Sequence, residues 1–225
     1  AALGLALPPG LASAETLTAT LRPLATSNQQ PATSNSQRLR LQLWRGGGGL
    51  YAPETTACSW LATTRSFVAN DAPLATAGFA ETVHSRLSPV SFCKGPESLT
   101  YVLAARERAQ RGLDELLLLD AAGHVAESVS AAVFWLADER LFTPALTTGC
   151  VAGVRRAHLL AVARQQGVEC REGLFGPAEL LRAEAVFTAN VAGIRAVGSL
   201  GEVRWETAPP LLLQLRQWEA GQQAV

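Results

Sequence analysis

Lys94 is the single lysine among the 19 Lys and Arg residues of this 225-residue sequence. It lies in the segment SFCKGPESL, next to Phe92 and Cys93 and shortly before Leu99. These neighbours predict a poorly solvated amine, and desolvation makes an amine a nucleophile toward carbonyl carbons. Composition alone favours a simpler interpretation, a surface lysine retained by chance.

Glu127 is a single carboxylate inside the apolar run VAESVSAAVFW. A carboxylate at such a position needs a cation or a hydrogen-bond donor, because burying an unpaired charge is costly. An arginine is the partner that the sequence alone favours. The protonated pyridine nitrogen of a bound ligand is the alternative.

Two further segments have the composition of anion-binding loops. In TTGCVAGVRRAHLL, threonines and glycines precede a predicted helix, whose first N–H groups and positive dipole end favour an anion. An ordinary threonine-capped helix explains this pattern equally well. In FTANVAG, a predicted strand ends at Thr188 and Asn190 and could donate hydrogen bonds to the same anion.

Together the four segments describe the binding site of one ligand. An amine for an aldehyde, a carboxylate for a ring nitrogen and two loops for a phosphate are what pyridoxal phosphate requires. Metal-ligand spacing is absent, because the cysteines form no CxxC pair and the three histidines are scattered. We therefore predict pyridoxal phosphate as the cofactor and no metal.

Helices and strands must position these segments. Sequence periodicity predicts helices over residues 11–22, 98–111 and 151–167, a short helix at 176–183 and a final one from Pro210. It predicts strands over 38–45, 57–68, 114–120, 125–137, 168–173 and 185–190, and a hairpin within 194–205. A polar loop is predicted over 26–37, and GGGG at 46–49 is predicted to be a turn. The fold class is mixed α/β, without repeats.

The segment ANDAPLATAG at 69–78 is a candidate linker, because Asn, Asp, Pro and Gly cluster there between apolar runs. We predict a small N-terminal domain over residues 1–72 and a cofactor-binding domain over 73–225. Basic and acidic residues number 19 each, so no broad basic surface for nucleic acid is expected. No apolar run reaches the roughly 18 residues of a membrane span, and the N-terminal segment lacks the basic region of a signal peptide.

The order of these features resembles the class IV, fold-type IV pyridoxal-phosphate enzymes. This family contains branched-chain aminotransferases, D-amino-acid aminotransferases and 4-amino-4-deoxychorismate lyases. The resemblance covers residues 85–200 and implies a two-domain fold with an incomplete small domain. It also implies a homodimer with the cofactor between the domains. Reduced cysteines predict a cytoplasmic location.

The resemblance implies roles for individual residues. Lys94 would form the Schiff base with the cofactor, and Glu127 would keep the pyridine nitrogen protonated. The phosphate would be bound by the backbone N–H groups of Val154 and Arg155 and by a second loop at Asn190 and Val191. Candidate substrate contacts would be Thr148 and Ser130.

The sequence departs from the family pattern at several points. Ala132 replaces the asparagine that usually precedes FW, and the segments GVRRAHLL and NVAGIRAV are each one residue short. Relatives often have methionine there, and this sequence contains none. We expect that the complete protein has methionines that this sequence lacks, and further N-terminal residues that include a phosphate contact.

Two positions separate the activities of the family. Branched-chain aminotransferases usually have tyrosine where this chain has Leu99, and GSGEN where it has SVSAA, which argues against a branched-chain enzyme. The FW after Glu127 favours a lyase that releases pyruvate to give 4-aminobenzoate, a step of folate biosynthesis. The alternative is a class IV aminotransferase acting on D-amino or branched-chain amino acids. Ala132 leaves a non-catalytic, cofactor-binding relative as a third interpretation.

Overall fold

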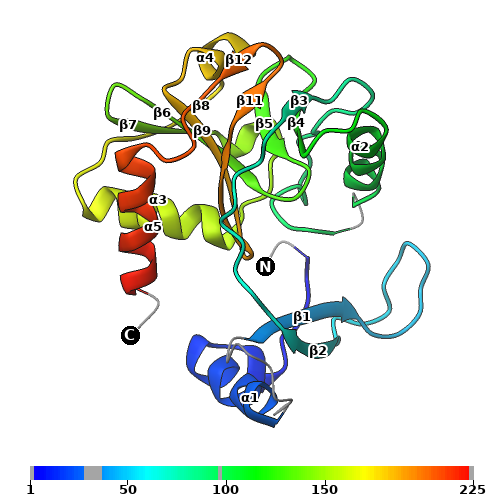
Figure 1. The fold of residues 1–225 in the computed structure, drawn as a ribbon. Coiled ribbons are helices and arrows are strands. Elements are labelled where there is room, and N and C mark those ends of the chain that lie inside the picture. Colours follow the sequence, from blue (N-terminus) through cyan, green and yellow to red (C-terminus); the bar gives the residue numbers. More distant parts are fainter. Residues whose placement is uncertain (1–2, 28–36, 96–97, 223–225) are drawn as a thin grey trace. The chain divides into compact units, whose positions relative to one another are not determined.

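The computed structural model describes residues 3–27, 37–95 and 98–222. The chain divides into two compact units, Ala1–Ala69 and Asn70–Val225 (Figure 1). Both units combine helices and strands, which confirms the predicted mixed α/β class. Most of the predicted polar loop at 26–37 lies outside the described residues.

The first unit is a helix packed against a β-hairpin. Its elements are η1 (Pro9–Leu11), α1 (Ala14–Ser27), β1 (Gln37–Arg45) and β2 (Cys58–Ser66). The alternation in RLRLQLWR correctly predicts strand β1, and the structure pairs it antiparallel with β2 over its whole length. The GGGG segment lies in their connection. The Arg45 guanidinium closes this connection by donating to the carbonyls of Thr55, at 2.9 Å, and Leu3, at 2.6 Å.

The second unit contains two five-stranded sheets, in the orders β10-β9-β6-β7-β8 and β12-β11-β3-β4-β5 (Figure 1). The strands are β3 (Ala77–Phe79), β4 (Glu115–Leu119), β5 (Val125–Ser128), β6 (Ala132–Ala137), β7 (Arg140–Pro144), β8 (Cys170–Gly173), β9 (Ala185–Asn190), β10 (Gly193–Val197), β11 (Ser199–Leu200) and β12 (Val203–Arg204). The helices are α2 (Ser98–Gln110), η2 (Leu146–Thr148), α3 (Val154–Gln165), α4 (Pro177–Leu181) and α5 (Pro210–Gln222). No helix in the described part of the chain is long and apolar enough to cross a lipid bilayer.

Alternating side chains hold these layers together. In β6, Val133 and Trp135 pack between the two sheets, whereas Phe134 and Leu136 pack against α3 and α5. In β4, Leu117 also packs between the sheets, and its two neighbours pack beneath α2. Both faces of the central strands are therefore buried, which explains why their sequences are continuous apolar runs.

The run 125–137, which predicts one strand, forms two strands in different sheets. β5 ends at Ser128 and β6 begins at Ala132. Ser128 closes the turn between them, since its backbone N–H and its Oγ both donate to the carbonyl of Ala131, at 2.9 and 3.0 Å. The chain therefore crosses to the other sheet directly after Glu127.

The hairpin predicted within 194–205 is only partly correct. The hairpin consists of β11 and β12, whereas β10 pairs with β9 in the other sheet. β10 is already bordered on its other side by the segment after Asn70, because the N–H groups of Asn70 and Leu74 donate to Ala192 and Ala196, both at 2.8 Å. The chain changes sheet at Gly198, a step that periodicity does not reveal.

Glu107 links α2 to the segment that follows β3 through hydrogen bonds. Its carboxylate is 7% exposed and accepts hydrogen bonds from the N–H groups of Glu81, at 2.9 Å, and Thr82, at 3.0 Å. It also accepts from the Thr82 hydroxyl, at 2.5 Å, and from Arg111, at 2.8 Å. Burial by itself raises the pKa of Glu107, but these hydrogen bonds outweigh it and lower the pKa to about 2.

We expect Glu107→Gln to destabilise the protein near neutral pH. Because the folded state lowers the pKa, the ionised carboxylate stabilises the fold above pH 4.5 and loses this effect as the pH falls toward 2. The free energy of unfolding should fall by about 3 kcal/mol at pH 7 and by roughly 1 kcal/mol at pH 3. Chemical denaturation at both pH values measures this, with the 73% exposed Glu81 changed to Gln as the control. Equal losses at the two pH values would contradict the assignment.

Candidate active site

Lys94 lies in the loop that leads into α2. The carbonyl of Phe92 accepts the N–H of Ala152 at 2.9 Å, so this loop is fastened to the segment that precedes α3. The Lys94 side chain is exposed, and the prediction of a poorly solvated amine is therefore wrong. Phe92 and Leu99 are 41% and 64% exposed, so these apolar neighbours do not cover the lysine.

Glu127 lies on β5, opposite Leu118 of β4, and is 5% exposed. Its Oε1 accepts the hydroxyl of Tyr101 at 2.7 Å, and its Oε2 accepts the N–H of Val151 at 3.2 Å. Burial raises the pKa of Glu127, opposed by the Tyr101 and Val151 hydrogen bonds and by the positive charge of Lys94. In the folded protein the charges of Lys94 and Glu127 therefore interact.

The start of α3 presents the backbone N–H groups of its first turn. The N-cap residue is Gly153, and no side chain caps the helix. The predicted threonine cap is not formed, because the Thr148 hydroxyl donates to the carbonyl of Ala145 at 2.8 Å. The first N–H groups of a helix have no acceptor within it. Those of Val154 and Arg155 can therefore bind an anion.

The side chain of Arg155 is directed to α5. Its guanidinium forms a 2.8 Å ion pair with Glu219, which is 3% exposed. Leu212 and Leu215 of α5 lie in the same apolar cluster as Leu159 of α3. Arg155 thus contributes only its backbone to the start of α3, while its side chain links α3 to α5 through Glu219. Figure 1 shows these two helices side by side.

Asn190 and Ser130 are joined by a hydrogen bond. The Asn190 amide donates to the carbonyl of Ser130 at 3.2 Å, and its Oδ1 accepts the N–H of Ala192 at 2.7 Å. The Asn190 side chain therefore shapes the loop after β9, and Val191 next to it is 56% exposed. This loop lies beside the turn that follows Glu127.

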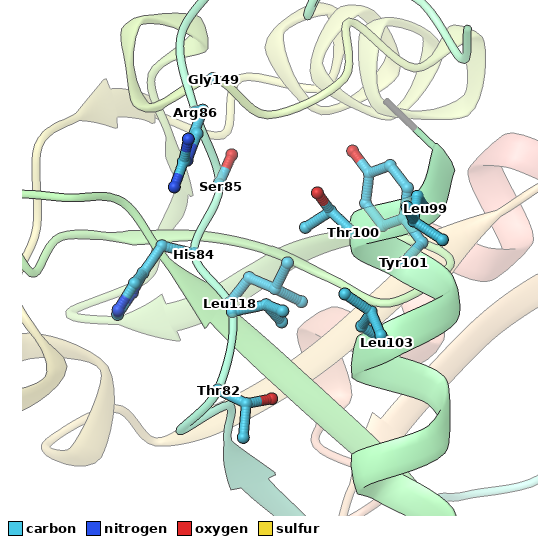
Figure 2. Close-up of a pocket in the computed structure, with 11 residues that line it drawn as sticks. Thr82, His84, Ser85, Arg86, Leu99, Thr100, Tyr101, Leu103, Leu118 and Gly149 are labelled. Atoms are coloured by element: carbon cyan, nitrogen blue, oxygen red, sulfur yellow. The ribbon is translucent and has the colours of Figure 1, made fainter. Parts of the chain in front are cut away.

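A pocket of about 490 Å³ lies between α2 and the segment 82–86 (Figure 2). Its lining comprises Thr82, Val83, His84, Ser85, Arg86, Leu99, Thr100, Tyr101, Leu103, Leu118 and Gly149. Gly149 has a φ of +85°, and a Cβ there would collide with the backbone of Arg86. Only glycine therefore fits this edge of the pocket. Tyr101 forms part of the wall and also holds Glu127.

Neither hydrogen-bond partner of Glu127 is predicted from the sequence. Tyr101 carries a signal, since it lies one helical turn before the small apolar residues Ala104 and Ala105. In the structure Ala104 is fully buried, and Tyr101 packs on the same inner face of α2. Leu99, the position compared with relatives, is on the exposed face. Val151 contributes a backbone N–H, which no sequence pattern identifies.

These residues fit pyridoxal phosphate. Glu127 forms no ion pair with an arginine in the described residues, contrary to the partner that the sequence alone favours. Its charge therefore remains available for a protonated ring nitrogen. Lys94 offers a primary amine near it, and the uncapped start of α3 offers donors for a phosphate.

Comparison with known proteins agrees with this geometry. The family described as Amino-transferase class IV matches residues 3–200. The chain belongs to this family. Class IV aminotransferases and their lyase relatives are pyridoxal-phosphate-dependent enzymes, and a solved branched-chain aminotransferase from Thermobaculum terrenum is described as the holo-form with this cofactor.

Individual class IV relatives include both kinds of enzyme. The branched-chain-amino-acid aminotransferase of Escherichia coli K12 is 29% identical over 104 residues, covering 46% of this chain and 34% of the relative. The aminodeoxychorismate lyase of Vibrio harveyi is 32% identical over 100 residues, covering 44% and 37%. The matched regions thus span about a third of the length of these curated relatives.

Solved class IV structures share the fold. An Escherichia coli branched-chain aminotransferase superposes with a TM-score of 0.82 at 22% identity, covering 95% of this chain and 72% of that one. A putative 4-amino-4-deoxychorismate lyase from Legionella pneumophila gives 0.73 at 23% identity, covering 82% and 69%. These likenesses confirm the predicted fold-type IV architecture.

We expect Glu127→Gln to stabilise the cofactor-free protein at pH 8. Because the fold raises the pKa of Glu127, its contribution to stability is lost as the pH rises from 4.5 through the folded pKa. A neutral amide of the same shape avoids the buried charge. Thermal unfolding should show a gain in Tm at pH 8 that shrinks toward pH 4.5, and a pH-independent change would contradict this explanation.

Proposed function

We propose that this protein is a pyridoxal-phosphate-dependent lyase that releases pyruvate from 4-amino-4-deoxychorismate and leaves 4-aminobenzoate. The observation that carries the cofactor assignment is the buried carboxylate of Glu127, which forms no ion pair within the described residues and interacts with the charge of Lys94. Leu99 in place of tyrosine and the lyase relative from Vibrio harveyi support the choice of reaction.

A class IV aminotransferase is the second candidate. It is favoured by the similarity to the Escherichia coli branched-chain-amino-acid aminotransferase and by the fold shared with such enzymes. For either activity we propose a cytoplasmic homodimer. Four free cysteines are typical of a reducing compartment and support the location.

Different residues of this chain would have different roles at the cofactor. Pyridoxal phosphate, when bound, supplies an aldehyde carbon for amines and a ring that stores an electron pair. Glu127 would hold a proton at the ring nitrogen, which strengthens the ring as an electron acceptor. The N–H groups of Val154 and Arg155 would bind the phosphate, together with the loop at Asn190 and Val191.

Lys94 would act twice. Its exposed amine would hold the cofactor through the aldehyde carbon. When a substrate amine occupies that carbon instead, Nζ would be free to take the proton from the substrate's α-carbon as a general base. Of the two candidate substrate contacts, Ser130 has an exposed side chain, whereas the Thr148 hydroxyl is bonded to Ala145. We therefore retain Ser130 as the substrate contact.

We expect Lys94→Arg to abolish activity and leave the fold intact. An arginine keeps the charge but forms no imine and is effectively always protonated. The rate should fall by at least about a thousandfold, with unchanged circular dichroism and Tm. Arg38→Lys, at an exposed site on β1, is the control and should change neither. Substantial activity in Lys94→Arg would exclude the assigned role.

Product analysis separates the two candidate reactions. We expect pyruvate release from 4-amino-4-deoxychorismate without any added keto acid, because a lyase needs no amino acceptor. The control is a panel of L- and D-amino acids with and without 2-oxoglutarate. A strict requirement for the acceptor would replace the lyase with the aminotransferase.

A further inference from the structure

The carboxylate of Glu127 is fixed from two directions. Tyr101 on α2 donates to Oε1 at 2.7 Å, and Val151 before α3 donates to Oε2 at 3.2 Å. Because each oxygen accepts one bond from a different element, the plane of the carboxylate cannot rotate without breaking one of them. Each carboxylate oxygen has a second lone pair, so a further donor can still bind.

The two donors favour the ionised form of Glu127 without neutralising its charge. A guanidinium in the place of Tyr101 would also favour the ionised form, but it would compete with a cationic ligand for the same charge. A tyrosine hydroxyl is neutral, so the negative charge remains for the ligand. In the described part of the chain, Tyr101 is the only side chain with a hydrogen bond to Glu127.

The ring of Tyr101 is held in place independently of its hydroxyl. It packs against the apolar cluster formed by Ala80, Ala104, Leu116, Leu118 and Val129, between α2 and β4. Glu127 pairs with Leu118 across the same sheet, so the cluster sets the distance between the phenol and the carboxylate. Figure 2 shows the hydroxyl at the N-terminal end of α2, at the wall of the pocket.

We propose that Tyr101 is the positioning residue that orients Glu127 toward the ring nitrogen of the cofactor. This role deepens the proposed function and rests on it for the identity of the ligand. The hydrogen bond itself belongs to the cofactor-free protein and can be tested there. Tyr101 needs no contact with the cofactor to act, because it acts through the carboxylate.

Tyr101→Phe removes the hydroxyl and keeps the ring. The chain offers a matched control, because its other tyrosine, Tyr51, is 94% exposed on the loop between β1 and β2. Both substitutions are made alone and together with Glu127→Gln. Two probes are compared by equilibrium dialysis at pH 8: pyridoxal phosphate and an analogue with a C–H group in place of the ring nitrogen.

We expect Tyr101→Phe to lower the affinity for pyridoxal phosphate about tenfold, which is the effect of losing a hydrogen bond to a charged group. Affinity for the analogue should be unchanged, because it has no nitrogen for Glu127 to bind. Tyr51→Phe should change neither affinity, and in the Glu127→Gln background the effect of Tyr101→Phe should vanish. Equal weakening of both probes, or the same loss in the Glu127→Gln background, would show that Tyr101 only supports packing.

The cofactor-free protein distinguishes failure of this proposal from failure of the proposed function. Among the described residues, Lys94 and Cys150 are the other titratable groups whose charges interact with Glu127, and they are the same in every variant. Tyr101→Phe should extend to higher pH the range over which stability falls, and this shift of its upper end should be absent with Glu127→Gln. If the shift occurs but wild-type protein binds neither probe, the function is wrong and the link between Tyr101 and Glu127 stands. If no shift occurs, the positioning role is wrong.

Discussion

The site depends on keeping the charge of Glu127 inside the protein. Moving a carboxylate out of water is costly, and most proteins offset this with a buried cation. Here the offset comes from a neutral hydroxyl, one backbone N–H and the nearby charge of Lys94, and it is incomplete, because the pKa of Glu127 is still raised. An incompletely compensated charge is what a binding site for a cationic ring requires.

The two-sheet architecture brings the parts of this environment together. Glu127 sits where the chain leaves one sheet for the other, so the loops before α2, before α3 and after β9 can all approach it. The hydrogen bonds between Phe92 and Ala152 and between Asn190 and Ser130 join these loops in pairs. Segments that lie far apart in the sequence are therefore held together next to Glu127.

Much of the second unit could be predicted because its elements are long or strongly periodic. The helices at α2 and α3 and the strands at β4, β8 and β9 agree with the predictions within a few residues. The break at Ser128–Ala131 could not be predicted, because strands buried on both faces have no alternation to mark where a sheet ends.

The site was predictable to a similar extent. Lys94 and Glu127 stand out by residue type, and the fold places them in one electrostatic environment. The solvent exposure of Lys94 depends on where its neighbours point, which the sequence does not encode locally. Tyr101 reaches Glu127 through a tertiary contact between a helix and a strand, and Val151 acts through its backbone N–H. No sequence motif therefore identifies either residue.

The ion pair between Arg155 and Glu219 ties the start of α3 to a helix that follows it much later in the chain. During synthesis, α3 and the strands around it emerge well before α5. Until residues through Glu219 have left the ribosome and docked, the Arg155 guanidinium lacks its buried counter-charge and the apolar face of α3 is uncovered. The start of α3 therefore gains its final packing only after α5 has been synthesised, even though its own backbone donors are encoded earlier.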